Sequence, residues 1–174
     1  MAVKTRPSRP VAPALPAFEA LDRTHRDILR CLDDMQRLVE HVDREGLDAV
    51  ARDLAREICT FFAGSAQLHH EAEEKIVFPP LLASGDAELV QNVRRLQQDH
   101  GWLEEDWLEL SPQLQSIADG YAGYDIEMLR RAVPVFNELY HEHIGLEESL
   151  VYPEARRREQ AAALAAEARR SDRE

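Results

Sequence analysis

The sequence predicts an all-α protein, an up-down-up-down antiparallel four-helix bundle, from three observations. The 174-residue chain is rich in Ala, Leu, Glu and Arg, which favour helices, and it has only 7 glycines and 9 prolines. Four long segments carry apolar residues at helical spacing, with turn residues between them. Segments of about 30 residues form rods of ~45 Å, and short loops between such rods place neighbouring helices antiparallel.

The first two helices are predicted over 18–43 and 48–78. Gly46 and Asp48 mark the turn between them. The second helix is expected to stop at the Pro79-Pro80 pair, because proline has no backbone N–H to donate and restricts the residue before it.

The third helix is predicted over 86–118, with Asp86 as its N-cap and Pro112 as an expected kink or break. A loop at 120–123 contains two glycines and leads into the fourth helix, predicted over 125–158. These boundaries complete four antiparallel rods.

The folded domain is expected to span residues 18–158. Residues 1–17 are rich in proline and basic, which predicts a flexible N-terminal arm, and 159–174 form a charged C-terminal tail. A chain of this length is enough for one domain with a core of its own.

The net charge is −12, which disfavours binding to nucleic acid and to anionic membrane surfaces. No apolar stretch is long enough to cross a bilayer, and no secretory signal is visible. The two cysteines, Cys31 and Cys59, cannot form a disulfide framework. We therefore expect a soluble protein of the cytoplasm.

The sequence contains an internal repeat. His25 recurs 75 residues later as His100, and the run that begins at His69 recurs 74 residues later at His143. Both runs follow the pattern His-x-x-x-Glu-Glu-x-x-x-(Phe/Tyr)-Pro. Two helical hairpins that supply the same ligands to a shared core would produce such a repeat.

The repeated polar residues lie on the apolar faces of the four helices. At 100° per residue, each helix turns one histidine inward, and the second and fourth helices add a glutamate one turn later. Ser65, Ile76 and Leu150 are expected on the same inner faces. Such groups are costly to bury without partners, and metal coordination would satisfy them together. The candidate ligands are His25, His69, Glu73, His100, His143 and Glu147.

The spacing also indicates how two metal ions would be held. Residues i and i+4 are neighbours on a helix, so an imidazole nitrogen and a carboxylate oxygen can converge on one ion. If Glu73 and Glu147 each bridge two metals, each metal receives two nitrogens and two oxygens. An octahedral ion then keeps one position for a bridging oxide or hydroxide and one open position for O₂, NO, peroxide or water. This donor set suits iron, manganese or zinc.

The runs HHEAEEKIVFP (69–79) and HIGLEESLVYP (143–153), with RTH ending at His25 and QDH ending at His100, resemble the hemerythrin-like (HHE cation-binding) family. The resemblance covers residues 18–158. It implies a four-helix bundle around a non-haem di-iron centre held by the six candidate ligands. Members of that family include oxygen carriers, oxygen or redox sensors, iron-sensing domains and proteins linked to nitrosative stress and iron–sulfur repair.

The ligand set departs from that of the oxygen carriers, which use five histidines with a second histidine one turn along a helix. Here Glu104 follows His100 by one turn, and Leu29 follows His25. The set of four histidines and two glutamates is similar to that of the sensing and repair branches, which argues against simple oxygen carriage.

We therefore predict a di-iron protein that binds O₂, NO or peroxide in oxygen, redox or nitrosative sensing or protection. Alternatives are a di-iron oxidase or peroxidase, an iron store or donor for iron–sulfur repair, and a purely structural bundle. Ferritin-like proteins use Glu-x-x-His pairs and more carboxylates than histidines, so we reject that interpretation.

Several neighbouring residues keep open roles at this stage. His70 could replace His69, with Glu74 as its partner, although the helical face and the repeat both favour His69. Glu104 is either a seventh ligand or an acceptor for an imidazole N–H. Tyr140 is close enough to His143 to reach the site, but we expect it to pack in the core. The remaining residues are expected outside the ligand set. Glu74 and Glu148 are predicted to be flanking carboxylates and His141 a surface residue. Core positions are predicted for Trp107, Phe62 and Phe136.

Overall fold

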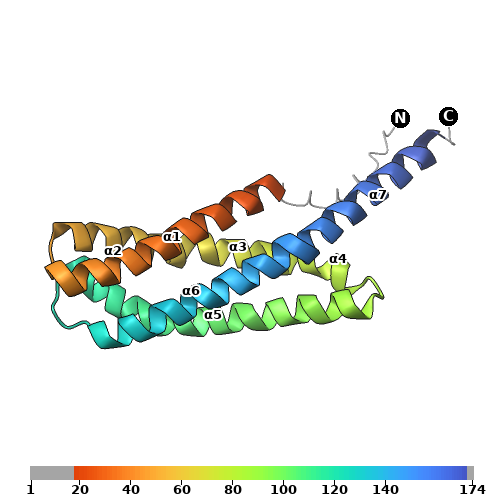
Figure 1. Ribbon diagram of the computed structural model, residues 1–174. Helices are drawn as coiled ribbons and strands as arrows, with labels where there is room; N and C mark the ends of the chain where they lie inside the picture. Colours follow the sequence, from red (N-terminus) through yellow and green to blue (C-terminus); the bar gives the residue numbers. More distant parts are fainter. Residues whose placement is uncertain (1–17, 172–174) are drawn as a thin grey trace, which may run out of the picture.

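The computed structural model describes residues 18–171 and confirms the all-α four-helix bundle (Figure 1). Four rods run antiparallel, and the second and fourth are each composed of several helical segments. The predicted flexible arm at 1–17 lies outside the described residues. The first rod is α1 (Phe18–Glu45), and the third is α5 (Ala87–Asp119). The second comprises α2 (Ala49–Phe61), η1 (Phe62–Ala66), α3 (Gln67–Ala72), η2 (Glu73–Val77) and α4 (Phe78–Leu82), and the fourth comprises α6 (Ile126–Leu146), η3 (Glu147–Val151) and α7 (Tyr152–Ser171).

Aspartate caps begin three of the helices. The carboxylate of Asp48 accepts a hydrogen bond from the N–H of Ala51, and Asp125 caps α6 in the same way. Asp86 caps α5, as predicted. Gly120 ends α5 with φ at 81°, a left-handed conformation that glycine adopts without steric cost.

The predicted stop at Pro79-Pro80 is wrong, because the helix continues to Leu82. Both prolines follow a π-helical turn, in which the N–H of Phe78 bonds to the carbonyl of Glu73. They therefore fall in the first turn of a new α-helical segment, where a missing N–H is tolerated. Likewise α5 runs through Pro112 without a break.

The π-helical turns η1, η2 and η3 also shift which residues face inward. Ser65, Ile76 and Leu150, expected on the inner faces, are each replaced there by the next residue along the chain. Val77 and Val151 are 2% and 0% exposed, whereas Leu150 is 38% exposed. A π-helical turn accommodates one more residue than an α-helical turn, so a face calculated at 100° per residue is displaced by one position.

The apolar core consists of two clusters, one on each side of a polar layer. The larger cluster includes Ile28 and Leu103, and the smaller includes Leu21 and Leu96. On α1 and on α5 a buried histidine separates the two clusters. The polar layer therefore crosses the interior of the bundle.

The last helix extends beyond the predicted end of the folded domain at residue 158. α7 continues to Ser171, and its residues 159–171 are exposed. In Figure 1 this end projects past the other rods. Within residues 18–171, no helix combines the length and the apolar character needed to cross a bilayer.

Candidate metal centre

All six residues predicted to bind metal lie together in the polar layer, between 0% and 6% exposed. Each rod contributes at least one of these residues, because the antiparallel bundle brings the middle of every rod to the same level. Their assignment as metal ligands remains our prediction. The residues are His25 on α1, His69 on α3, Glu73 at the start of η2, His100 on α5, His143 on α6 and Glu147 at the start of η3.

Four of these residues form what we call the interior group: His25, His69, Glu73 and Glu147. One donor atom from each lies within 4.8 Å of the others. His25 Nε2 is 3.1 Å from Glu147 Oε2, and His69 Nε2 is 3.4 Å from Glu73 Oε1. The group is closed to solvent on every side.

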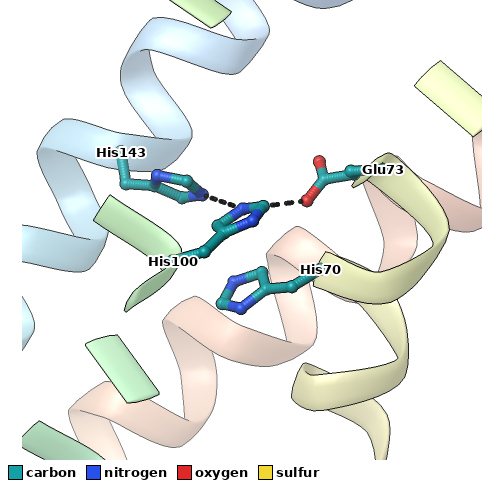
Figure 2. A group of neighbouring side chains, drawn as sticks. All are labelled: His70, Glu73, His100 and His143. Carbon is teal, nitrogen blue, oxygen red and sulfur yellow. Dashed lines mark hydrogen bonds and ion pairs between the residues drawn. The ribbon is translucent and has the colours of Figure 1, made fainter. Parts of the chain in front are cut away.

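A second cluster, the pocket group, combines His70, Glu73, His100 and His143 within the same 4.8 Å limit (Figure 2). His100 Nε2 is 3.2 Å from His143 Nε2 and 3.4 Å from Glu73 Oε2. Three of these residues are buried, and His70 is half-buried at the edge.

The two glutamates connect the two groups. Glu73 directs Oε1 to His69 and Oε2 to His100. Glu147 directs Oε2 to His25 and Oε1 to His143, at 3.1 and 3.2 Å. Each carboxylate thus offers one oxygen to each group, which is the arrangement that two bridged cations require.

Several of these atoms lie close together and still lack a hydrogen bond. Among residues 18–171, His69 Nε2, Glu73 Oε2 and both carboxylate oxygens of Glu147 are buried without a hydrogen-bond partner. A buried polar atom left without a partner costs about 1–3 kcal/mol. One cation in each group would satisfy all four atoms, so the donor set fits bound metal.

Charge balance in the metal-free protein depends on protons. Burial is the largest single influence on His143 and opposes its protonation, but Glu147, Asp99 and Glu73 together outweigh it and raise the pKa of His143 to about 10. Burial and the neighbouring Glu147 raise the pKa of Glu73 to about 7. Despite its burial, Glu147 has a pKa well below its usual range, because His143 and His25 stabilise its charge. Bound cations would take the place of these protons.

An outer set of carboxylates orients the imidazole rings. The Nδ1–H of His25 donates to Glu148 at 3.0 Å, and that of His100 donates to Glu74 at 2.9 Å. Each glutamate follows a predicted ligand in sequence but bonds to a histidine of the other half of the repeat. Such bonds fix the ring so that Nε2 faces the metal. The flanking role predicted for both glutamates agrees with these contacts.

Asp99, which the sequence analysis did not single out, is also close to this layer. It is 3% exposed, and its carboxylate lies 3.8 Å from Nδ1 of His143. A buried acidic residue directly before a predicted ligand histidine was the available signal.

His70 and His69 belong to different groups, so the structure places the two rings at different positions. His69 lies in the interior group, whereas the ring of His70 stacks on that of His100 with centroids 4.0 Å apart. The Nε2 atom of His70 has no hydrogen-bond partner. Adjacent residues on a helix point 100° apart, so a helix that faces both groups can direct one histidine to each.

Tyr152 is the site residue that the sequence analysis missed. Its hydroxyl donates a hydrogen bond to Glu73 Oε1 and lies 3.2 Å from His25 Nε2. Its repeat counterpart, Phe78, stacks on His100. The available signal was the change from Phe78 to Tyr152 at equivalent positions of the two repeated runs.

Tyr140 packs in the core, as expected, with its ring 5.0 Å from that of Phe136. It also borders a pocket of about 450 Å³ that reaches the pocket group. Phe62 and Trp107 form apolar walls of this pocket. The exposed Glu104 lies at its edge and not among the donor atoms of either group.

Residues 17–173 match the family model described as the hemerythrin HHE cation-binding domain. The chain is also similar to an uncharacterized protein of Haemophilus influenzae, with 28% identity over 134 residues. That alignment covers 76% of this chain and 75% of the relative.

Proposed function

The chain belongs to the hemerythrin HHE cation-binding domain family, and from this premise we propose that it holds two iron ions which together bind a small ligand. The small molecule that binds to the iron ions would be O₂, NO or peroxide. The role of the protein would be oxygen, redox or nitrosative sensing or protection. An oxide or hydroxide ion would bridge the two iron ions.

The observation that carries this proposal is the division of each glutamate between the two groups. Glu73 and Glu147 each contact imidazoles of both groups through separate oxygens. A single cation needs only one such group. Nitrogen and oxygen donors without thiolate suit iron, which supplies a redox-active centre able to bind diatomic molecules.

The pocket supports a route for the small ligand. It reaches His70 and His100 from the surface, whereas the interior group is closed. Glu71, Glu74 and Glu104 line the same opening. Their negative charge disfavours anions, so neutral molecules such as O₂, NO and hydrogen peroxide are the better candidates.

A second candidate is a di-iron oxidase or peroxidase, which the size of the pocket favours. A volume of about 450 Å³ exceeds what a diatomic molecule fills and falls in the range of pockets for small organic ligands. Repeated turnover of peroxide with an organic reductant would support the enzyme, and stoichiometric binding would support the sensor.

We also propose that the protein acts in the cytoplasm without nucleic-acid or membrane partners. Its net charge is −12, and Cys31 and Cys59 are both free thiols. Burial raises the pKa of Cys31 to about 12 and that of Cys59 to about 11, which leaves both unreactive.

The test is iron quantitation with optical spectroscopy of the purified protein as isolated, after reduction, and after addition of O₂, NO or peroxide. We expect two irons per chain and a spectrum that changes with the added ligand. The variant His69→Ala should bind less iron, whereas His141→Ala, which removes an exposed histidine, should bind as much as the wild type. Full iron content in His69→Ala would refute the site.

A further inference from the structure

Tyr152 lies where it can contact a metal ion directly. It is the first residue of α7, immediately after η3, and is 1% exposed. Its ring stacks on that of His25, with centroids 5.2 Å apart and an angle of 9° between the planes. This stacking holds the hydroxyl beside the interior group.

The spacing of the hydroxyl matches that of a ligand. In an octahedral site with bonds of about 2.1 Å, adjacent donor atoms lie about 3 Å apart. The interior group has such spacings at 3.1 Å, between His25 and Glu147, and at 3.4 Å, between His69 and Glu73. The Tyr152 hydroxyl oxygen lies 3.2 Å from His25 Nε2 and continues the same series.

The repeat separates the role of the hydroxyl from that of the ring. Phe78 occupies the equivalent position in the first half and stacks on His100 at 5.6 Å. Stacking on the imidazole therefore needs no hydroxyl. The hydroxyl instead donates to Glu73 and lies beside His25, so both of the atoms near it belong to the interior group.

We propose that Tyr152 is a metal ligand which coordinates the interior iron through its phenolate oxygen, an inference that rests on the proposed di-iron function. On coordination the phenol O–H bond breaks, an iron–oxygen bond forms and the proton leaves to solvent, with no change in the oxidation state of the iron. Tyr152 then fills the remaining terminal position of the interior group, and exogenous ligands bind only from the pocket.

The experiment compares visible absorption and resonance Raman spectra of the ferric, iron-loaded wild type, Tyr152→Phe and Tyr121→Phe, which changes an exposed tyrosine away from the site. A phenolate bound to ferric iron gives a charge-transfer band in the visible region. We expect the wild type and Tyr121→Phe to show the band, and Tyr152→Phe to lose it while retaining two irons per chain.

Wild-type protein made with ring-deuterated tyrosine provides a measurement that does not depend on the folding of a variant. Its enhanced Raman modes should shift if a phenolate binds the iron. A two-iron wild type with no tyrosine-dependent modes, or a Tyr152→Phe variant that keeps the band, would overturn the Tyr152 assignment alone. A wild type that takes up no iron would overturn the proposed function as well.

Discussion

The substitution Glu147→Ala removes one of the two carboxylates that contact imidazoles of both groups, and its effect can be estimated in two parts. In the metal-free protein, Glu147 is 0% exposed and pairs with His25 and His143. Breaking a buried ion pair costs about 3–5 kcal/mol. We take the lower end, about 3 kcal/mol, because His25 keeps its contact with Glu148 at 3.0 Å.

The second part is the stabilisation that bound metal confers. Free metal at 100 times its dissociation constant stabilises the native state by about 2.7 kcal/mol per site. Two sites give about 5 kcal/mol. For a domain of this size, 1 kcal/mol corresponds to roughly 2–4 °C in Tm.

Thermal unfolding of both proteins, with and without ferrous iron under anaerobic conditions, tests the estimate. Metal-free Glu147→Ala should melt about 6–12 °C below the metal-free wild type. Iron should raise the wild-type Tm by about 10–20 °C and that of the variant by far less. Glu142→Ala is the matched control, since Glu142 is exposed and, among residues 18–171, pairs only with Arg95.

Glu147→Gln keeps the size of the side chain and removes the charge, so it reports on the site if the alanine variant does not fold. An iron-induced rise in Tm equal to that of the wild type, in either variant, would show that Glu147 does not bridge two metals. The proposed centre would then have to be abandoned.

Three further outcomes are expected. His70→Ala should keep two irons, because each iron retains two histidines and two carboxylate oxygens. The variant should nevertheless change the rate of NO binding. Loss of one iron on metal analysis would make His70 an essential ligand. Glu104→Gln should keep two irons and speed azide binding by roughly twofold at low salt, since it removes one negative charge from the pocket. An unchanged rate of azide binding in stopped-flow measurements would contradict entry through this pocket. Metal loading should release protons, more at pH 6 than at pH 8: the raised pKa values of His143 (about 10) and Glu73 (about 7) mean that both groups hold protons at pH 6, whereas at pH 8 His143 still holds its proton and Glu73 has largely lost its own. A pH indicator that shows no release would refute this charge balance.

The fold and the position of the site could be predicted because both depend on residues that recur at regular intervals over long stretches of the sequence. Four segments of helical periodicity define the rods, and the offset of 75 residues between His25 and His100 relates the two hairpins. Residues at the middle of antiparallel helices must lie at one level. The arrangement of Glu73 and Glu147 between two groups agrees with the expectation from their spacing.

The details that could not be predicted come from departures of the backbone from an α-helix. The sequence carries no simple signal for π-helical turns at Glu73 and Glu147, so the inner face was assigned one residue too early, at Ile76 and Leu150. Such turns are frequent at functional sites. Here they begin at the two glutamates, which relates the irregular backbone to the polar layer.

On the proposed function, the differences between the two halves would decide where a small ligand binds. A perfectly repeated chain would give two equal metal positions. In this chain His70 has Ile144 as its repeat counterpart, and Tyr152 has Phe78, so each half directs one additional polar ring toward a different group.

These two rings are not equivalent, because their surroundings differ. His70 is half-buried and lines the pocket, and its Nε2 has no hydrogen-bond partner within the described part of the chain. Tyr152 is enclosed by Phe18 and His25 and donates to Glu73. On the proposed function, a ligand that enters by the pocket would therefore meet the pocket group first, while Tyr152 would complete the set of protein donors in the interior group.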